Sequence, residues 1–146
     1  MKIKALATLF IVLLLVACNS NTEEINYLDP IEVELITNDD LEVNAEINTQ
    51  AVISQSGNPV SNVSEVIFEI WQHGNKETYI TVDGTEVGEG VYEVTWRAEE
   101  EGIYYIYYHI TAAGMHRMEK IHFIIGDVDE KKILATPDER PNQFMD

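Results

Sequence analysis

Two histidines and a methionine near the C-terminal end of the chain are the residues best suited to chemistry. His109, His116 and Met118 lie in one segment, IYYIYYHITAAGMHRMEKIHFII, which spans residues 103–125. Imidazole nitrogen and thioether sulfur together suit a soft or borderline metal ion, above all copper, whereas a thioether is a poor ligand for hard cations. The three residues therefore indicate copper as the one candidate cofactor.

The elements that must position these residues are two predicted strands. We predict one strand over residues 103–111 and the last strand over residues 115–125, because their side chains alternate in the way that a strand with one buried face does. Gly114 allows a tight turn between the two strands. An even number of loop residues places Ile121 opposite Ile106, so that both apolar sets share one face.

In that register the candidate ligands face one another across the hairpin. Thr111 lies opposite His116 and His109 lies opposite Met118, and directly opposed Cβ atoms are about 4.5 to 5.5 Å apart. We therefore expect His109, His116 and Met118 to lie within reach of one ion. The alternative is that His116 and Met118 pack at a strand end while His109 bonds a carbonyl group. Another histidine, His73, ends a separate predicted strand, and the sequence does not place it near this site.

The same hairpin presents a second candidate surface. Its polar face also carries four residues that predict a metal-free docking face for a membrane-protein partner: Tyr105, Tyr107, Lys120 and His122. Aromatic residues on both sides of a strand are equally typical of a central strand whose outer face is covered.

Period-two alternation in the rest of the chain predicts an all-β domain. Apolar and polar side chains alternate over residues 31–35, 41–47 and 66–70. About seven to eight short antiparallel strands, without a long helical segment, predict an immunoglobulin-like β-sandwich over residues 29–126. An open barrel is the alternative.

The first 17 residues predict a lipoprotein signal peptide. Lys2 and Lys4 precede an apolar run of about twelve residues, which as a helix rises roughly 18 Å against a hydrocarbon core of roughly 30 Å. The run ends in Leu15-Val16-Ala17-Cys18, which resembles the bacterial lipobox. We expect Cys18 to become the acylated first residue, with chains such as palmitate, and to anchor the protein to the extracytoplasmic side of the cell membrane. An ordinary cleaved signal with a chance cysteine is the alternative.

The flanks of the domain are polar. Residues 18–28 predict a tether, and the charged residues 127–146, with two prolines, predict a disordered tail. Cys18 is the only cysteine in the sequence. Once it is acylated, we expect neither a disulfide nor a thiolate metal site.

Charge and motifs limit the classes of function. The formal net charge is −17, and such an acidic chain repels phosphate backbones, so we expect no nucleic-acid partner. The sequence has no Gly-x-Ser-x-Gly and no His-Glu-x-x-His motif, and the glycines of residues 84–90 lack the ending of a phosphate loop. These features predict a non-enzymatic accessory or binding module.

Four short motifs carry a resemblance to a known family. They are Phe68-Glu69-Ile70-Trp71, Gly90-Val91-Tyr92, Gly102-Ile103-Tyr104 and, above all, the run from His109 to Met118. Together they resemble the YtkA-like domain of bacterial lipoproteins and FixH-related proteins, over roughly residues 30–126. One departure is Glu119, where the family run often has proline. The resemblance implies an immunoglobulin-like domain outside the membrane, a link to cytochrome oxidase assembly and metal supply, and no known reaction.

Overall fold

The computed structural model describes residues 28–38, 41–75 and 79–138. The predicted signal peptide, Cys18 and the tether up to residue 27 lie outside the described residues. Within the described part, no helix is long and apolar enough to cross a membrane. The elements in chain order are β1 (Ile31–Thr37), β2 (Ile47–Gln55), β3 (Asn58–Pro59), β4 (Val63–Gln72), β5 (Ile80–Asp83), β6 (Thr85–Gly88), β7 (Val91–Trp96), β8 (Gly102–Ala112), β9 (Met115–Ile125) and α2 (Glu130–Leu134).

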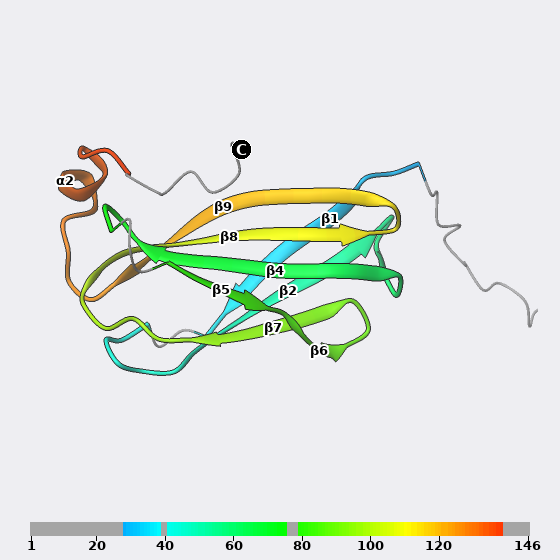
Figure 1. Ribbon diagram of the computed structural model, residues 1–146, viewed down its shortest axis with the longest axis horizontal. Coiled ribbons are helices and arrows are strands. Elements are labelled where there is room, and N and C mark those ends of the chain that lie inside the picture. Colours follow the sequence, from blue (N-terminus) through cyan, green and yellow to red (C-terminus); the bar gives the residue numbers. More distant parts are fainter. Residues whose placement is uncertain (1–27, 39–40, 76–78, 139–146) are drawn as a thin grey trace, which may run out of the picture.

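The strands form two antiparallel sheets. One sheet has the order β1-β2-β7-β6, with β3 paired to β2, and the other has the order β5-β4-β8-β9. Figure 1 shows β4, β8 and β9 side by side, with β1 and β2 running obliquely to them. Apart from the edge strand β5 and the short β3, this is the four-against-three strand order of the immunoglobulin fold. The predicted sandwich is confirmed, and two separate sheets rule out the open barrel.

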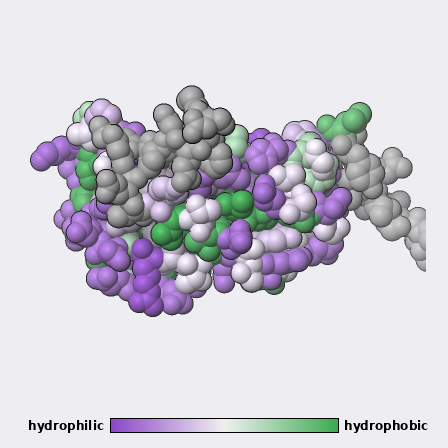
Figure 2. Space-filling model, viewed as in Figure 1, coloured by the Kyte–Doolittle hydropathy of each residue, from purple (hydrophilic) through white to green (hydrophobic). Residues whose placement is uncertain are grey.

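The core lies between the two sheets. Its side chains come from the inner faces of both, and the fully buried ones include Phe68, Ile106 and Tyr108. Trp96 donates its indole N–H to Oγ1 of Thr49 at 3.0 Å, so this buried polar pair is satisfied. In Figure 2, hydrophilic residues cover most of the visible face, and hydrophobic residues gather in a short central area.

One predicted strand is wrong. Residues 41–46 form a turn and irregular chain, and β2 begins only at Ile47. Asn44 has a left-handed backbone, with φ of 63°, which interrupts an extended strand. Leu41 and Val43 still pack against the core. The alternation of apolar and polar residues over 41–46 therefore results from burial of every second side chain and not from strand pairing.

The Gly102-Ile103-Tyr104 motif forms a tyrosine corner at the start of β8. The hydroxyl of Tyr104 donates to the carbonyl of Glu100 at 3.1 Å and accepts from the N–H of Glu100 at 3.3 Å. A tyrosine at the start of this strand, bonded to backbone a few residues upstream, is a hallmark of immunoglobulin-like sandwiches. The motif thus fixes the connection that leads from one sheet to the other.

Replacing Tyr104 with phenylalanine is expected to lower the free energy of unfolding by about 1 to 2 kcal/mol, because two hydrogen bonds to the backbone are lost. Tyr92→Phe is the matched control, since the Tyr92 hydroxyl makes no hydrogen bond within the described residues, and we expect a change below about 0.5 kcal/mol. Urea unfolding followed by fluorescence measures both. Equal effects of the two substitutions would argue against the tyrosine corner.

The C-terminal hairpin has the predicted register. Every expected pair between β8 and β9 is present, including Thr111 with His116 and His109 with Met118. At the turn, Ala113 and Gly114 both have positive φ (50° and 76°), as a two-residue type I′ turn requires. The candidate ligands therefore share the face that points away from the core.

The segment after β9 differs from the predicted disordered tail. Residues 127–138, which we call the C-terminal strap, contain α2 and lie against the sheet that contains β8. The reason is apolar contact: Ile133 packs on a cluster that includes the buried Trp71 and Tyr105. The charge and proline content of this segment predicted disorder. The aliphatic side chain of Ile133 nevertheless contacts an apolar surface of the sheet and holds the strap there.

Candidate functional site

All four histidines of the chain lie on one surface, the side of β4, β8 and β9 that points away from the core, which we call the outer face. His109, His116 and His122 alternate with inward-facing residues along β8 and β9. His73 follows β4, and its Nδ1 lies 2.9 Å from the hydroxyl of Tyr105. The imidazole groups of the chain are therefore concentrated on the outer face.

Near the hairpin turn, the outer face carries the histidine–methionine cluster, which consists of His109, His116 and Met118. The two imidazole centroids are 6.2 Å apart. Nδ1 of His116 lies 2.8 Å from Oγ1 of Thr111. The hydroxyl of Tyr107 donates to Sδ of Met118 at 3.6 Å, and its ring packs edge-on to His109 with centroids 4.5 Å apart. The structure thus brings the three sequence-predicted ligands together.

A buried carboxylate lies beside His109. Nε2 of His109 is 3.0 Å from Oε1 of Glu69, whose side chain is 3 % exposed. Burial lowers the pKa of His109 and His116 lowers it further, while Glu65 acts in the opposite direction. The lowered pKa favours the neutral imidazole, which keeps a lone pair for a metal. In metal sites, a histidine ligand commonly turns its other ring nitrogen toward a carboxylate in this way.

The donors of the cluster fit a soft ion. Within the part of the chain that the structure describes, no three His, Cys, Asp or Glu side chains are grouped closely enough to hold a metal. A site at this place therefore needs the sulfur of Met118, which is 49 % exposed and can be reached from solvent. Two imidazoles and one thioether suit copper better than calcium or magnesium.

The other end of the outer face is covered by the C-terminal strap. Trp71, Ile103 and Tyr105 form an apolar cluster in which each side chain is at most 5 % exposed. Ile133 of the strap packs against this cluster. Tyr105, predicted to lie in an open docking face, is therefore buried beneath the chain's own strap. This agrees with the alternative interpretation of a covered outer face.

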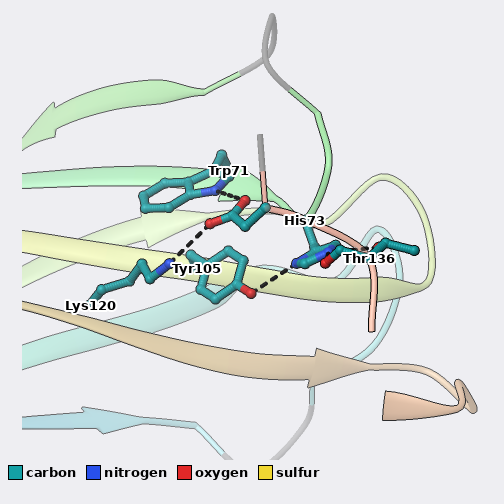
Figure 3. A network of polar contacts seen from close by, with 6 residues as sticks. Trp71, His73, Tyr105, Lys120 and Thr136 are labelled. Atoms are coloured by element: carbon teal, nitrogen blue, oxygen red, sulfur yellow. Dashed lines mark hydrogen bonds and ion pairs between the residues drawn. The ribbon is translucent and has the colours of Figure 1, made fainter. Parts of the chain in front are cut away.

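Polar contacts hold the strap to the sheet, and Figure 3 shows them. Asp138 accepts from the indole N–H of Trp71 at 3.1 Å and pairs with Nζ of Lys120 at 3.0 Å. The ammonium of Lys120 also lies 4.3 Å from the ring centroid of Tyr105, a cation–π contact. Burial raises the pKa of Tyr105, and the Asp138 carboxylate adds to this effect. Lys120, another predicted docking residue, is thus engaged by the strap.

The two remaining histidines also contact the strap. Nε2 of His73 lies 3.0 Å from Oγ1 of Thr136 (Figure 3), and Nε2 of His122 lies 3.0 Å from Oε1 of Glu130. Of the predicted docking residues, only Tyr107 lies beside the histidine–methionine cluster instead. His73 shares the outer face with the candidate ligands but lies at its opposite end, so the structure does not bring it into the metal site.

Sequence reasoning missed two residues of this face. Glu69 carries a charge between Ile67 and Trp71 on the same side of a strand, and that isolated carboxylate was the available signal of a buried partner. Asp138 gave no comparable signal, because one more acidic residue in a charged tail is unremarkable in the sequence.

Fold and site together define the class: an immunoglobulin-like β-sandwich that gathers its histidines on one outer face. The family can also be stated. The model of the YtkA-like family matches residues 26–109, which is more than half of the chain, so the chain belongs to that family. The match ends at His109, and the rest of the run to Met118 lies beyond it.

The solved structures similar to this chain include the following two. An engineered protein aligns at 14% identity over 65% of this chain, with a TM-score of 0.48, and the aligned part is 20% of that protein's length. The PmoD soluble domain from Methylocystis sp. ATCC 49242 (Rockwell) aligns at 12% identity over 68% of this chain and 93% of its own, with a TM-score of 0.46. No curated protein matches the chain.

Proposed function

We propose that the protein is a non-enzymatic accessory module that binds a copper ion with His109, His116 and Met118. The observation that carries the proposal is that two imidazoles, with centroids 6.2 Å apart, lie at the turn end of the outer face with Met118 paired directly opposite His109. The lowered pKa of His109 supports it, because a metal must displace a proton from any histidine that is charged. The resemblance to FixH-related proteins points in the same direction.

We propose further that the module works at the outer surface of the cell membrane, held by acyl chains on Cys18. The support is the short apolar leader and the lipobox-like run that ends at this cysteine. Mass spectrometry of the native protein is expected to show a chain that begins at an acylated Cys18. An intact leader, or a free thiol at residue 18, would contradict this placement.

Copper titration tests the metal site. The parent protein and every variant in this experiment carry Cys18→Ser, because a free thiol binds copper. Cu(I) is added in the presence of a competing chelator. We expect one ion to bind with a dissociation constant below about 1 μM, and we expect His116→Ala and Met118→Leu each to weaken binding by about tenfold or more.

The chain offers a matched control for each substitution. His122→Ala removes an imidazole from the same face, and Met115→Leu removes a thioether from the same strand, but neither side chain belongs to the cluster. Both controls are expected to keep the parent affinity. Binding weaker than about 1 μM, or equal losses for His116→Ala and His122→Ala, would exclude the proposed ligand set.

A further inference from the structure

The C-terminal strap is added to a sandwich that is complete without it. β8 and β9 pair along their whole length, from Gly102 with Ile125 to the turn, and the strap begins only after β9 has ended. Its helix, α2, has five residues, none of them buried. A helix of this length is not stable on its own in water. The position of the strap therefore depends on its side-chain contacts with the outer face.

The groups of the outer face that contact the strap come from three strands. The apolar cluster of Trp71, Ile103 and Tyr105 receives the aliphatic side chain of Ile133. Five residues later, the carboxylate of Asp138, with its side chain 15% exposed, meets the indole N–H of Trp71 on β4 and Nζ of Lys120 on β9. The receiving groups belong to β4, β8 and β9, so the sandwich holds them in place whether or not the strap is bound.

We propose that this strap-covered face is a docking site for a partner protein segment that carries an aliphatic side chain and, five residues later, a carboxylate. The protein's own strap fills the site in the structure and shows the chemistry that fits it. Charge complementarity favours such a partner, because Lys120 and the indole N–H of Trp71 both donate to the carboxylate of Asp138 and present the same two donors to a partner's carboxylate. The proposal concerns the end of the outer face away from the histidine–methionine cluster and does not rest on copper binding.

The strap and the partner compete for one site. A segment joined to its site by a short link has a local concentration in the millimolar range, so it excludes a free segment of equal intrinsic affinity. The docking site opens when the strap is weakened. A full-length chain with Ile133→Ser and Asp138→Asn should therefore bind a free segment that the unsubstituted chain largely excludes.

The probe is a labelled synthetic peptide with the sequence of residues 127–138, DVDEKKILATPD. Fluorescence anisotropy is expected to show binding to the doubly substituted chain at least tenfold tighter than to the unsubstituted chain. The chain has two tryptophans, and their indole N–H signals in NMR spectra report on different places. We expect the signal of Trp71 to move on peptide binding, while that of Trp96, bonded to Thr49 in the core, stays in place.

Peptide variants provide the matched controls. A peptide with Asp138→Asn is expected to bind at least tenfold more weakly, whereas a peptide with Asp127→Asn, which makes the same change of charge, is expected to bind as the parent does. If the doubly substituted chain does not fold, Asp138→Asn alone replaces it, with a smaller gain expected. Equal binding to substituted and unsubstituted chains, equal binding of the two peptides, or binding only through dimers that exchange straps would overturn the proposal.

Discussion

Replacing His109 with leucine is expected to lower the free energy of unfolding by about 3 kcal/mol. The substitution leaves the carboxylate of Glu69, a residue that is 2 % exposed, facing an apolar side chain in place of the imidazole 3.0 Å away. The loss is large because a buried carboxylate cannot regain hydration within the folded sheet.

Replacing both members of the pair should be much less harmful. The double substitution Glu69→Leu with His109→Leu removes the buried carboxylate together with its neighbour, and we expect it to be at least about 1.5 kcal/mol more stable than His109→Leu alone. Urea unfolding of the parent, both single variants and the double variant gives the complete cycle. Effects that add to within about 0.5 kcal/mol would show that the two side chains are not coupled.

The same pair predicts a dependence of stability on pH. Burial lowers the pKa of His109 below its ordinary value of 6.5, so the unfolded chain binds this proton more readily than the folded one. Stability is therefore lost as the pH falls from about 6.5 toward the lowered pKa of the folded state. The double variant should lack this contribution, and unfolding measured across that range in metal-free buffer can detect the difference.

Replacing Gly90 with alanine is expected to lower the free energy of unfolding by about 2 to 4 kcal/mol, for two additive reasons. Gly90 has a φ of +70°, which strains any residue with a side chain, and a Cβ atom there would lie 2.7 Å from the carbonyl oxygen of Ile53. The obstacle is backbone that is itself paired, since the N–H of Ile53 donates to the carbonyl of Gly90. The strand cannot move aside without breaking that pair.

Gly102 is the matched control, because it begins the second of the two Gly-Val/Ile-Tyr motifs. The three atoms nearest to a Cβ atom there all belong to the flexible side chain of Gln72, with its nitrogen 2.7 Å away, and the φ of Gly102 does not lie in the left-handed region. We expect Gly102→Ala to stay within about 1 kcal/mol of the parent. Equal effects of the two substitutions would show that the two motifs do not differ as the structure indicates.

The hairpin was predictable because two independent patterns in it agree. Alternation assigned the apolar face, and Gly114 gave the turn, so Ile106 could pair only with Ile121 if the core was to form. That register also placed His116 and Met118 beside His109. Local sequence was sufficient because every one of these contacts lies within one pair of neighbouring strands.

The remaining parts of the site depend on contacts between distant segments. Glu69 reaches His109 only because β4 pairs with β8, and Asp138 reaches Trp71 only because the strap folds back over the sheet. No local pattern encodes either contact. The strand predicted over residues 41–46 was wrong for a related reason. Asn44, with its left-handed backbone, interrupts the strand, while packing against the rest of the fold accounts for the alternation of apolar and polar residues.

X-ray absorption at the copper edge reports which atoms bind the copper ion that we propose His109, His116 and Met118 to hold. For the Cys18→Ser protein loaded with one equivalent of Cu(I), we expect one sulfur and two imidazole nitrogens around the metal. We also expect the sulfur to be lost in Met118→Leu but not in Met115→Leu. A copper site without sulfur, or one whose sulfur survives Met118→Leu, would show that Met118 is not a ligand.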